Sequence, residues 1–360
     1  MRIAVTGASG LIGWHIECAL QAEGIDVVAV DRQAFADPHR LADAIRDTDI
    51  VVHAAGANRG DDVDVVATNI DLARGLATAV TTVPTPPHVI YLNSTHIDRD
   101  TAYGSSKREA ARILASTNAP FLDLVLPGVF GEHGRPFYNS VVSTFCYQLA
   151  HGQSPSIEND AEMQLIHVQD VADLVMCSAA ETLTGSHRPS GRTIRVTELA
   201  ARLEALSCTY ATGVVPSISD PFERAIFNTL RSYRFPHLYP TQLEPRSDER
   251  GRLIELVQAH TAGQMFISST VPGVTRGNHF HRRKVERFIV VEGTATISLR
   301  RLLHNDVVTF TVSGQHPVAV DIPTLHTHNI TNVGSDSLTT VFWTDEIFDP
   351  ARPDTYAAIV

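Results

Sequence analysis

Residues 6–13 read Thr6-Gly7-Ala8-Ser9-Gly10-Leu11-Ile12-Gly13, a GxxGxxG pattern at the end of the apolar run 3–6. Glycines at this spacing permit a tight turn and a close backbone approach, and the helix that follows then directs its N-terminus at a pyrophosphate. The pattern is informative here because it joins a predicted strand to a predicted helix. We therefore expect a dinucleotide-binding turn. Its cofactor-binding residues would be Gly7, Ser9, Gly10, Leu11, Ile12 and Gly13.

Short apolar runs alternate with helical patterns from this turn to about residue 180. Strands that alternate with helices imply a parallel sheet covered on both faces, so we predict a Rossmann-type, doubly wound α/β domain. The expected strands are 3–6, 27–31, 50–54, 89–93 and 122–126. The expected helices are 11–22, 38–47, 65–80, 105–116, 168–182 and 194–207.

The pattern changes past residue 250, where short strands with turn signals replace the helical periodicity. Closely spaced strands of this kind indicate an antiparallel sandwich or barrel. We expect strands at 290–300, 306–312, 318–322 and 338–343, and a helix over 217–233 between the halves. The domain boundary is placed after residue 237, which gives domains 1–237 and 238–360.

Charge and composition exclude some classes of protein. The chain of 360 residues has a formal net charge of −11, which argues against nucleic acid or an anionic membrane as its main partner. No apolar run approaches the roughly 20 residues that span a bilayer, and the N-terminus lacks the pattern of a signal peptide. Four scattered cysteines without a CxxC pattern indicate reduced thiols, so we expect a cytoplasmic protein.

The second predicted strand ends at Asp31-Arg32. An acidic residue at this point usually bonds the adenine ribose and favours NAD, whereas an arginine accommodates the 2′-phosphate of NADP. Because both are present, the residues leave NADPH and NADH open as alternatives.

Tyr103-Gly104-Ser105-Ser106-Lys107 is a YxxxK pattern. Positions i and i+4 of a helix share a face, so the phenol and the ammonium can approach one substrate atom. The ammonium would lower the pKa of the tyrosine, which could then pass a proton to an alkoxide as hydride arrives. The strand before it ends in Asn93-Ser94-Thr95, which would supply a hydroxyl to hydrogen-bond the carbonyl.

Together with Val52-His53-Ala54-Ala55-Gly56 and Asn69, these motifs resemble the extended short-chain dehydrogenase/reductase family over about residues 1–235. The resemblance implies a cofactor site that includes Asp31, Arg32, Ala55, Asn69, Tyr103 and Lys107. It also implies a catalytic triad of Tyr103, Lys107 and a hydroxyl. Thr95 best matches that hydroxyl, with Ser94 as the second choice.

The spacing of Gly273, His279-Phe280-His281, Glu286 and Gly293 matches the first cupin motif. Residues two apart in a strand point to the same side, so His279 and His281 can face one barrel interior, where Glu286 adds an oxygen ligand. We therefore predict a C-terminal all-β cupin barrel.

The second cupin motif matches at Pro323, His328 and Asn332, although Leu325 replaces the usual glycine. Three histidines and a carboxylate suit zinc or another divalent metal, so we predict a site of His279, His281, Glu286 and His328. His326 alternates with His328 and is a rival ligand. A metal-free epimerase barrel with a histidine base is the alternative.

A reductase followed by a cupin resembles the CapF family of bifunctional capsular polysaccharide synthesis enzymes over essentially the whole chain. The stretches that carry this resemblance are Phe137-Tyr138-Asn139-Ser140-Val141, Thr144-Phe145-Cys146-Tyr147, Gly277-Asn278-His279, Thr327-His328-Asn329-Ile330, Phe348-Asp349-Pro350 and Pro353-Asp354-Thr355-Tyr356. The resemblance implies a zinc-binding homodimer that acts on a UDP-linked 2-acetamido-2,6-dideoxy-4-hexulose. The cupin would epimerise C3, and the reductase would then reduce the C4 ketone with NADPH. The product would be UDP-N-acetyl-6-deoxy-talosamine, on the route to N-acetyl-L-fucosamine.

The chemistry of a C4 ketone connects the two reactions. The ketone acidifies the C3 proton, and a nearby cation stabilises the oxyanion that develops. Arg276 and Lys284 beside the first cupin motif are candidate contacts for the ketone or a phosphate. One alternative is a reductase or epimerase of another nucleotide sugar with a structural or oxygenase-like cupin. Another is a non-catalytic nucleotide-sensing scaffold.

Overall fold

A computed structural model describes all 360 residues, which fold into two compact units. Unit 1 comprises Met1–Thr144 and Ile157–Thr197, and unit 2 comprises Phe145–Ser156 and Glu198–Val360. The boundary after residue 237 stays a prediction. No helix has both the length and the apolar character needed to cross a membrane.

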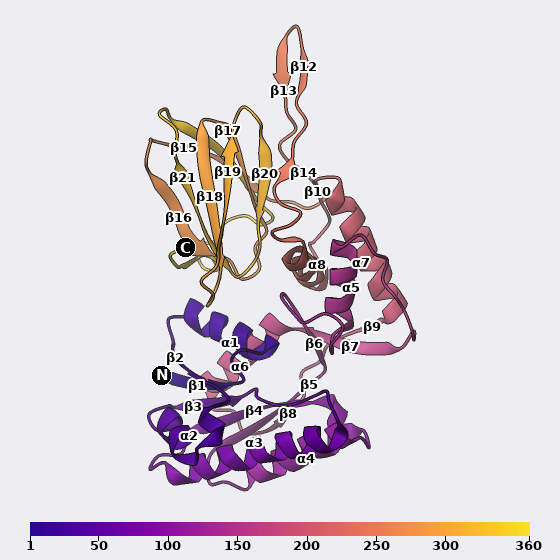
Figure 1. The fold of residues 1–360 in the computed structure, drawn as a ribbon, viewed down its shortest axis with the longest axis vertical. Helices are drawn as coiled ribbons and strands as arrows, with labels where there is room; N and C mark the ends of the chain where they lie inside the picture. Colours follow the sequence, from indigo (N-terminus) through magenta and orange to yellow (C-terminus); the bar gives the residue numbers. More distant parts are fainter. The chain divides into compact units, whose positions relative to one another are not determined.

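Unit 1 is built on a six-stranded parallel sheet in the order β2-β1-β3-β4-β5-β8 (Figure 1). The chain starts inside this sheet, with β2 on one side of β1 and β3 on the other, so the loop after β1 lies at the switch point where ligands bind in such sheets. The predicted Rossmann-type fold is confirmed. The strands are β1 (Arg2–Thr6), β2 (Asp26–Val30), β3 (Ile50–His53), β4 (His88–Ser94), β5 (Phe121–Leu126) and β8 (Gly185–His187).

Helices cover both faces of this sheet, because alternate residues of each strand point to opposite faces. Ile3 and Val5 pack against α1 and α6, whereas Ala4 packs in the core formed with α2, α3 and α4. A small sheet, β6-β7-β9, completes the unit. These elements are α1 (Leu11–Ala22), α2 (Pro38–Ile45), α3 (Asp62–Thr82), α4 (Ala102–Ala115), α6 (Val168–Glu181), β6 (Gly128–Phe130), β7 (Glu162–His167), β9 (Arg192–Arg195), and the short helices η1 (Ala34–Ala36) and η2 (Thr95–Asp98).

The first helix begins differently from its neighbours. In α2, α3 and α4 the N-cap side chains of Asp37, Asp61 and Thr101 accept hydrogen bonds from backbone N–H groups of the first turn. The N-cap of α1 is Gly10, which has no side chain to do so. The N–H groups of its first turn therefore stay available to an anion.

Unit 2 contains two five-stranded antiparallel sheets, β11-β20-β17-β22-β15 and β19-β18-β21-β16-β23 (Figure 1). Side chains of both sheets, such as Phe288, Val320, Ile297 and Ile330, form one apolar core. The predicted all-β barrel is confirmed. The strands are β11 (Thr241–Gln242), β15 (Gln264–Thr270), β16 (Thr275–Phe280), β17 (Glu286–Glu292), β18 (Thr294–Arg301), β19 (Val307–Ser313), β20 (Val318–Ile322), β21 (His326–Asn332), β22 (Leu338–Thr344) and β23 (Tyr356–Ala357).

Several elements differ from the sequence prediction. The predicted strand 290–300 is two strands, β17 and β18, because Gly293 turns the chain with a φ of +85°. The helix predicted from residue 217 begins at Pro221, after the N-cap Asp220. Elements that were not predicted include α5, β15 and the β12–β13 hairpin. The remaining bounds are α5 (Val141–Ala150), α7 (Val196–Ala211), α8 (Pro221–Arg234), β10 (Val214–Val215), β12 (Arg246–Asp248), β13 (Gly251–Leu253) and β14 (Gln258–Ala259).

Candidate functional sites

The glycine turn after β1 is packed so closely that larger residues are excluded. Gly7 has a φ of +68°, and a Cβ there would lie 2.7 Å from the backbone nitrogen of Ala55. A Cβ on Gly13 would lie 2.3 Å from the Gly7 oxygen. Ser9 and Gly10 are exposed, whereas Leu11 and Ile12 are half-buried. The structure thus brings the predicted turn residues and Ala55 together at one edge of the sheet.

Asn69 fixes the loop that follows β3. Its Nδ2 donates to the Ala57 oxygen and to the Ser106 hydroxyl, while its Oδ1 accepts from the Ala57 nitrogen. The side chain therefore holds this loop against α4, and its direct contact with a cofactor stays a prediction.

Tyr103 lies in the first turn of α4, beside the end of β4. Thr101 caps the helix by accepting from Gly104 N at 3.0 Å, and a Cβ on Gly104 would lie 2.3 Å from the His96 oxygen. The Tyr103 hydroxyl lies within hydrogen-bonding reach of the Ser94 side chain. Burial raises the pKa of Tyr103, and the hydrogen bond from Ser94 opposes that rise.

Lys107 lies one turn further along α4 and is buried. Its Nζ donates to the Leu92 oxygen at 2.8 Å and lies 4.1 Å from the centre of the Tyr91 ring. Burial lowers the pKa of Lys107 to about 7, and the negative charge of Asp123 opposes this shift. Asn93 donates to Asp123 at 2.8 Å and holds it in place. Asp123 was not predicted, although an acidic residue inside the apolar run 121–126 could have indicated it.

The two candidate hydroxyls, Ser94 and Thr95, lie in different elements. β4 extends to Ser94, one residue beyond the predicted strand, so the Ser94 side chain continues its alternation and reaches Tyr103. Thr95 begins η2, where the chain turns. The second choice, Ser94, therefore has the geometry expected of the triad hydroxyl, whereas the predicted role of Thr95 stays untested.

For the ketone reduction that the sequence predicts, replacing Ser94 by alanine should lower kcat/KM by about 10²-fold, because a donor to the reacting oxygen is lost. Replacing Thr95 by valine should lower kcat/KM less than about tenfold, since Thr95 begins η2 and Ser94 is the residue that bonds Tyr103. Steady-state kinetics of the two variants compares them directly. A larger loss for Thr95→Val would show that Thr95 is the catalytic hydroxyl.

His53 makes the stability of unit 1 sensitive to acid. It is buried beside Thr6, whose hydroxyl lies 2.8 Å from Nδ1, and its ring stacks on Tyr91. Burial lowers the pKa of His53 to about 3, and Lys107 adds to the shift. The unfolded chain therefore binds more protons than the folded chain between pH 3 and pH 6.5, and stability is lost as the pH falls through this window.

We expect unit 1 to lose roughly 2 kcal/mol of unfolding free energy between pH 7 and pH 5 through His53 alone. In His53→Asn this part of the loss should disappear. Urea unfolding followed by Trp14 fluorescence, in a Trp343→Phe background, reports on unit 1. An equal pH dependence with and without His53 would contradict the prediction.

Four side chains of unit 2 form a compact group: His279, His281, Glu286 and His328. Their ligand atoms all lie within 4.8 Å of one another. The Glu286 carboxylate is 2.9 Å from His281 Nε2 and 3.2 Å from His328 Nε2, and His279 is the cross-strand partner of His328. The structure thus brings together all four predicted metal ligands, whose role as ligands stays a proposal.

Two of these rings are oriented by backbone carbonyls. His281 Nδ1 lies 2.6 Å from the Asp354 oxygen, and His328 Nδ1 lies 3.2 Å from the His326 oxygen. Each Nδ1 can therefore donate a proton to its carbonyl, which leaves Nε2 of both rings directed at the Glu286 carboxylate and able to bind a metal through its lone pair. Lone pairs and a carboxylate that converge in a buried site are stabilised by a cation, so this donor set fits zinc or another divalent metal.

The rival ligand His326 does not join the group. Its Nδ1 lies 3.0 Å from the Thr324 oxygen, and its ring packs edge-on against Phe235 with centres 5.0 Å apart. Lys284 was expected to contact the ketone or a phosphate. In the structure its Nζ donates to the Pro353 oxygen at 2.9 Å. The Asp354 carboxylate accepts the backbone N–H groups of residues 282–284 and so fixes the loop after His281.

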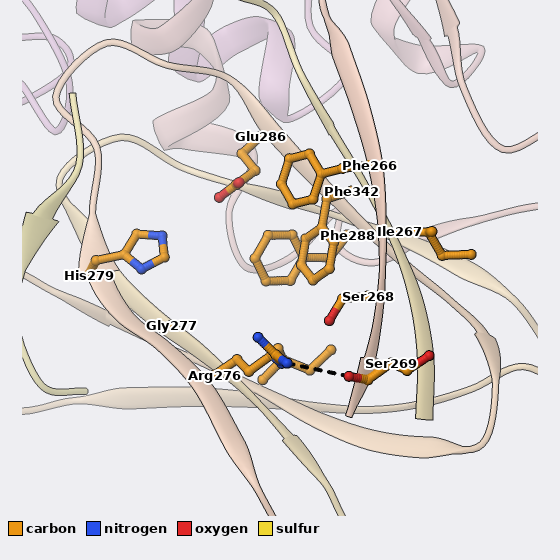
Figure 2. Close-up of a pocket in the computed structure, with 11 residues that line it drawn as sticks. Phe266, Ile267, Ser268, Ser269, Arg276, Gly277, His279, Glu286, Phe288 and Phe342 are labelled. Atoms are coloured by element: carbon orange, nitrogen blue, oxygen red, sulfur yellow. Dashed lines mark hydrogen bonds between the residues drawn. The ribbon is translucent and has the colours of Figure 1, made fainter. Parts of the chain in front are cut away.

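A cavity of about 540 Å³ opens beside the metal-ligand group. His279 and Glu286 line it, so a bound metal could meet a ligand there (Figure 2). Phe266, Phe288 and Phe342 form its apolar wall, and they were not predicted. These three side chains are cross-strand partners in one row of the sheet.

Comparisons with known proteins match both halves of the chain to described families. Residues 3–189 match the NAD dependent epimerase/dehydratase family, and residues 246–356 match the polysaccharide biosynthesis C-terminal domain. The two matches define a nucleotide-sugar enzyme of the NAD(P)-dependent epimerase/dehydratase class with an added β domain. The chain belongs to this family and, within it, is a CapF-like epimerase/reductase.

The relatives that support this placement match the chain over its full length. It is 32% identical to the UDP-2-acetamido-2,6-beta-L-arabino-hexul-4-ose reductase of Pseudomonas aeruginosa, over 100% of this chain and 99% of that protein. It is 29% identical to the capsular polysaccharide assembling protein CapF of Staphylococcus aureus, with a TM-score of 0.61 and both chains covered fully. The UDP-N-acetylglucosamine 4-epimerase of Bacillus cereus, 16% identical over 65% of this chain and 97% of its own, has a TM-score of 0.56 and shares the fold alone.

Proposed function

We propose that this enzyme acts twice on a UDP-linked 2-acetamido-2,6-dideoxy-4-hexulose. The cupin epimerises C3, and the Rossmann-type domain then reduces the C4 ketone to give UDP-N-acetyl-6-deoxy-talosamine, a capsule precursor. The observation that carries the proposal is the presence, in one chain, of a Ser94–Tyr103 pair beside Lys107 and a metal-ligand group beside a cavity. The hexul-4-ose in the name of the Pseudomonas relative supports the choice of substrate.

In the reduction, side chains of α4 and β4 donate the proton and hydrogen-bond the reacting oxygen. The bound nicotinamide supplies the hydride that reduces C4. Tyr103 donates its phenolic proton to O4 as negative charge develops there, and Ser94 hydrogen-bonds the same oxygen. The Lys107 ammonium stabilises the phenolate that remains, and Asp123 favours the charged form of Lys107.

NADPH is the proposed reductant. Arg32 is exposed at the end of β2, where it can meet a 2′-phosphate, while Asp31 Oδ1 already accepts from Ala34 N at 2.9 Å. Comparing kcat/KM for NADPH and NADH on the same ketone tests this choice. A higher value with NADH would contradict it.

In the epimerisation, His279, His281, Glu286 and His328 would hold zinc or another divalent metal. A bound metal acts as a Lewis acid that polarises a carbonyl oxygen. The C4 carbonyl acidifies the C3–H bond, so loss of this proton and its return on the opposite face inverts C3. The cavity beside His279 and Glu286 is where the sugar ring would lie.

Hydrogen exchange tests this half of the proposal separately. With metal-loaded enzyme in D₂O and no nicotinamide, we expect the C3 proton signal of the UDP-4-keto sugar to disappear. If C3 does not exchange while C4 is still reduced after NADPH is added, the epimerase assignment is wrong. The alternative is then a reductase with a structural or oxygenase-like cupin.

A homodimer formed through β15 is part of the proposal. β15 is the edge strand of its sheet and exposes Met265 and Ile267, which are 56% and 68% accessible. An exposed apolar edge strand favours pairing with another chain. Light scattering should give twice the 39.2 kDa mass of the chain, and a monomer at micromolar concentration would contradict the dimer.

A further inference from the structure

The cavity of unit 2 has two chemically different sides. His279 and Glu286 line one side, and Arg276 lines the other with Ser268 and Ser269 (Figure 2). The aromatic wall lies between them in this view. A ligand that fills the cavity would therefore place a carbonyl-bearing part beside the metal-ligand group and an anionic part beside the arginine.

A β-bulge brings Arg276 to this cavity. Arg276 and His279 are three residues apart, so a regular strand would point them to opposite faces. Gly277 and Asn278 have φ values of +102° and +60°, and the register with β21 shifts between Gly277 and His279. The extra residue of the bulge brings both side chains to the same face of the strand. Bulges beside active sites commonly redirect a side chain in this way.

The bulge is fixed by its surroundings. A Cβ on Gly277 would lie 2.8 Å from the His328 oxygen, which leaves no room for a larger residue. The Asn278 side chain accepts from Asn329 Nδ2 at 3.0 Å, and its backbone oxygen accepts from Ala358 N at 2.9 Å. The position of Arg276 therefore follows from the same packing that positions His328.

The Arg276 guanidinium is held but not neutralised. Its Nε donates to the Thr270 hydroxyl at 3.0 Å, and its Nη2 lies 3.4 Å from the Ser269 oxygen. Both partners are uncharged residues of β15. A positive charge that lacks a carboxylate partner in a cavity is well suited to bind an anion, and a guanidinium matches phosphate oxygens with two parallel hydrogen bonds.

We propose that Arg276 binds the diphosphate of the nucleotide sugar in the cupin cavity, with the Ser268 hydroxyl as an added donor. The inference rests on the proposed epimerase function, because it says where the diphosphate of that substrate binds, away from the metal-ligand group. It makes the cupin specific for nucleoside-diphosphate sugars over free sugars. Arg276 is then a specificity residue that acts on binding and not on the proton transfer at C3.

The test uses C3 exchange in D₂O with metal-loaded Tyr103→Phe enzyme and no nicotinamide, so that only the cupin is observed. Two substrates are compared: the UDP-linked 4-hexulose and the methyl glycoside of the same hexulose, which lacks phosphate. Arg276→Gln should raise KM for the UDP-linked sugar roughly 10- to 100-fold, with kcat within about threefold. It should leave exchange of the methyl glycoside unchanged.

Two further variants control the experiment. Arg276→Lys keeps the charge and should recover part of the lost affinity. Arg252→Gln makes the same charge change on the exposed β13, outside the cavity, and should match the parent.

An unchanged KM for Arg276→Gln would overturn the proposal. A fall in kcat on both substrates at constant KM would also overturn it, because Arg276 would then act at the ketone. Absence of exchange in the parent would overturn the epimerase function and this assignment with it.

Discussion

Replacing Tyr103 by phenylalanine is expected to lower the rate of C4 reduction by about 10²- to 10⁴-fold, the usual contribution of a positioned general acid. The variant loses the proton donor but keeps the ring, which packs edge-on against His96 with ring centres 5.6 Å apart. C3 exchange should stay at the parent rate, because we propose that it takes place at the cupin. NADPH oxidation and NMR of C3 in the same sample measure the two activities.

The retained C3 exchange is the internal control for folding in this experiment. The double variant Tyr103→Phe/Lys107→Met should lower the rate of C4 reduction little more than Tyr103→Phe alone, because the effects of groups that act as a unit are not additive. Normal reduction by Tyr103→Phe would mean that the reductase site is elsewhere.

Replacing His328 by glutamine should weaken metal binding at least about 100-fold and remove C3 exchange, since even supporting side chains around a metal contribute about 10- to 100-fold. Reduction of the ketone should persist. Metal content after dialysis and C3 exchange are the two readouts. A chelator should reproduce the effect in the parent enzyme, and added zinc should reverse it.

His326 offers a matched control for this experiment. It lies two residues before His328 on β21 and is also buried, and its ring contacts Phe235 and is not part of the metal-ligand group. His326→Gln should therefore keep its metal and its C3 exchange. Loss of metal from His326→Gln, with His328→Gln unaffected, would show that the rival ligand is the true one.

The sequence predicted those features that depend on local spacing. The glycine turn must follow a strand and open a helix, so GxxGxxG located β1 and α1 together, and α1 has the predicted bounds. Short apolar runs predicted β2, β3, β4 and β5, because both faces of a parallel sheet are buried, whereas the short, exposed strand β8 was not predicted. His279 and His281 were predicted as neighbours because they are two residues apart, and their rings lie 5.0 Å apart.

Features that depend on packing could not be predicted in this way. Ser94 and Thr95 are adjacent, and only the end of β4 decides which one reaches Tyr103. His326 and His328 have the same parity, and the contact with Phe235 separates them. Arg276 is three residues from His279, so a regular strand would point it away from the cavity, and the bulge at Gly277 brings it to the same face. Positive φ values at Gly277 and Asn278 are compatible with the Gly-Asn pair, but many such pairs form turns instead.

The central claim is that one molecule of ketone is first inverted at C3 and then reduced at C4. The most direct test is a single turnover of metal-loaded enzyme with the UDP-4-keto sugar and NADPH in D₂O, with the product analysed by NMR and mass spectrometry. We predict a product with deuterium at C3, protium from NADPH at C4, and inverted C3 stereochemistry. A reduced product that keeps its original proton and configuration at C3 would contradict the claim.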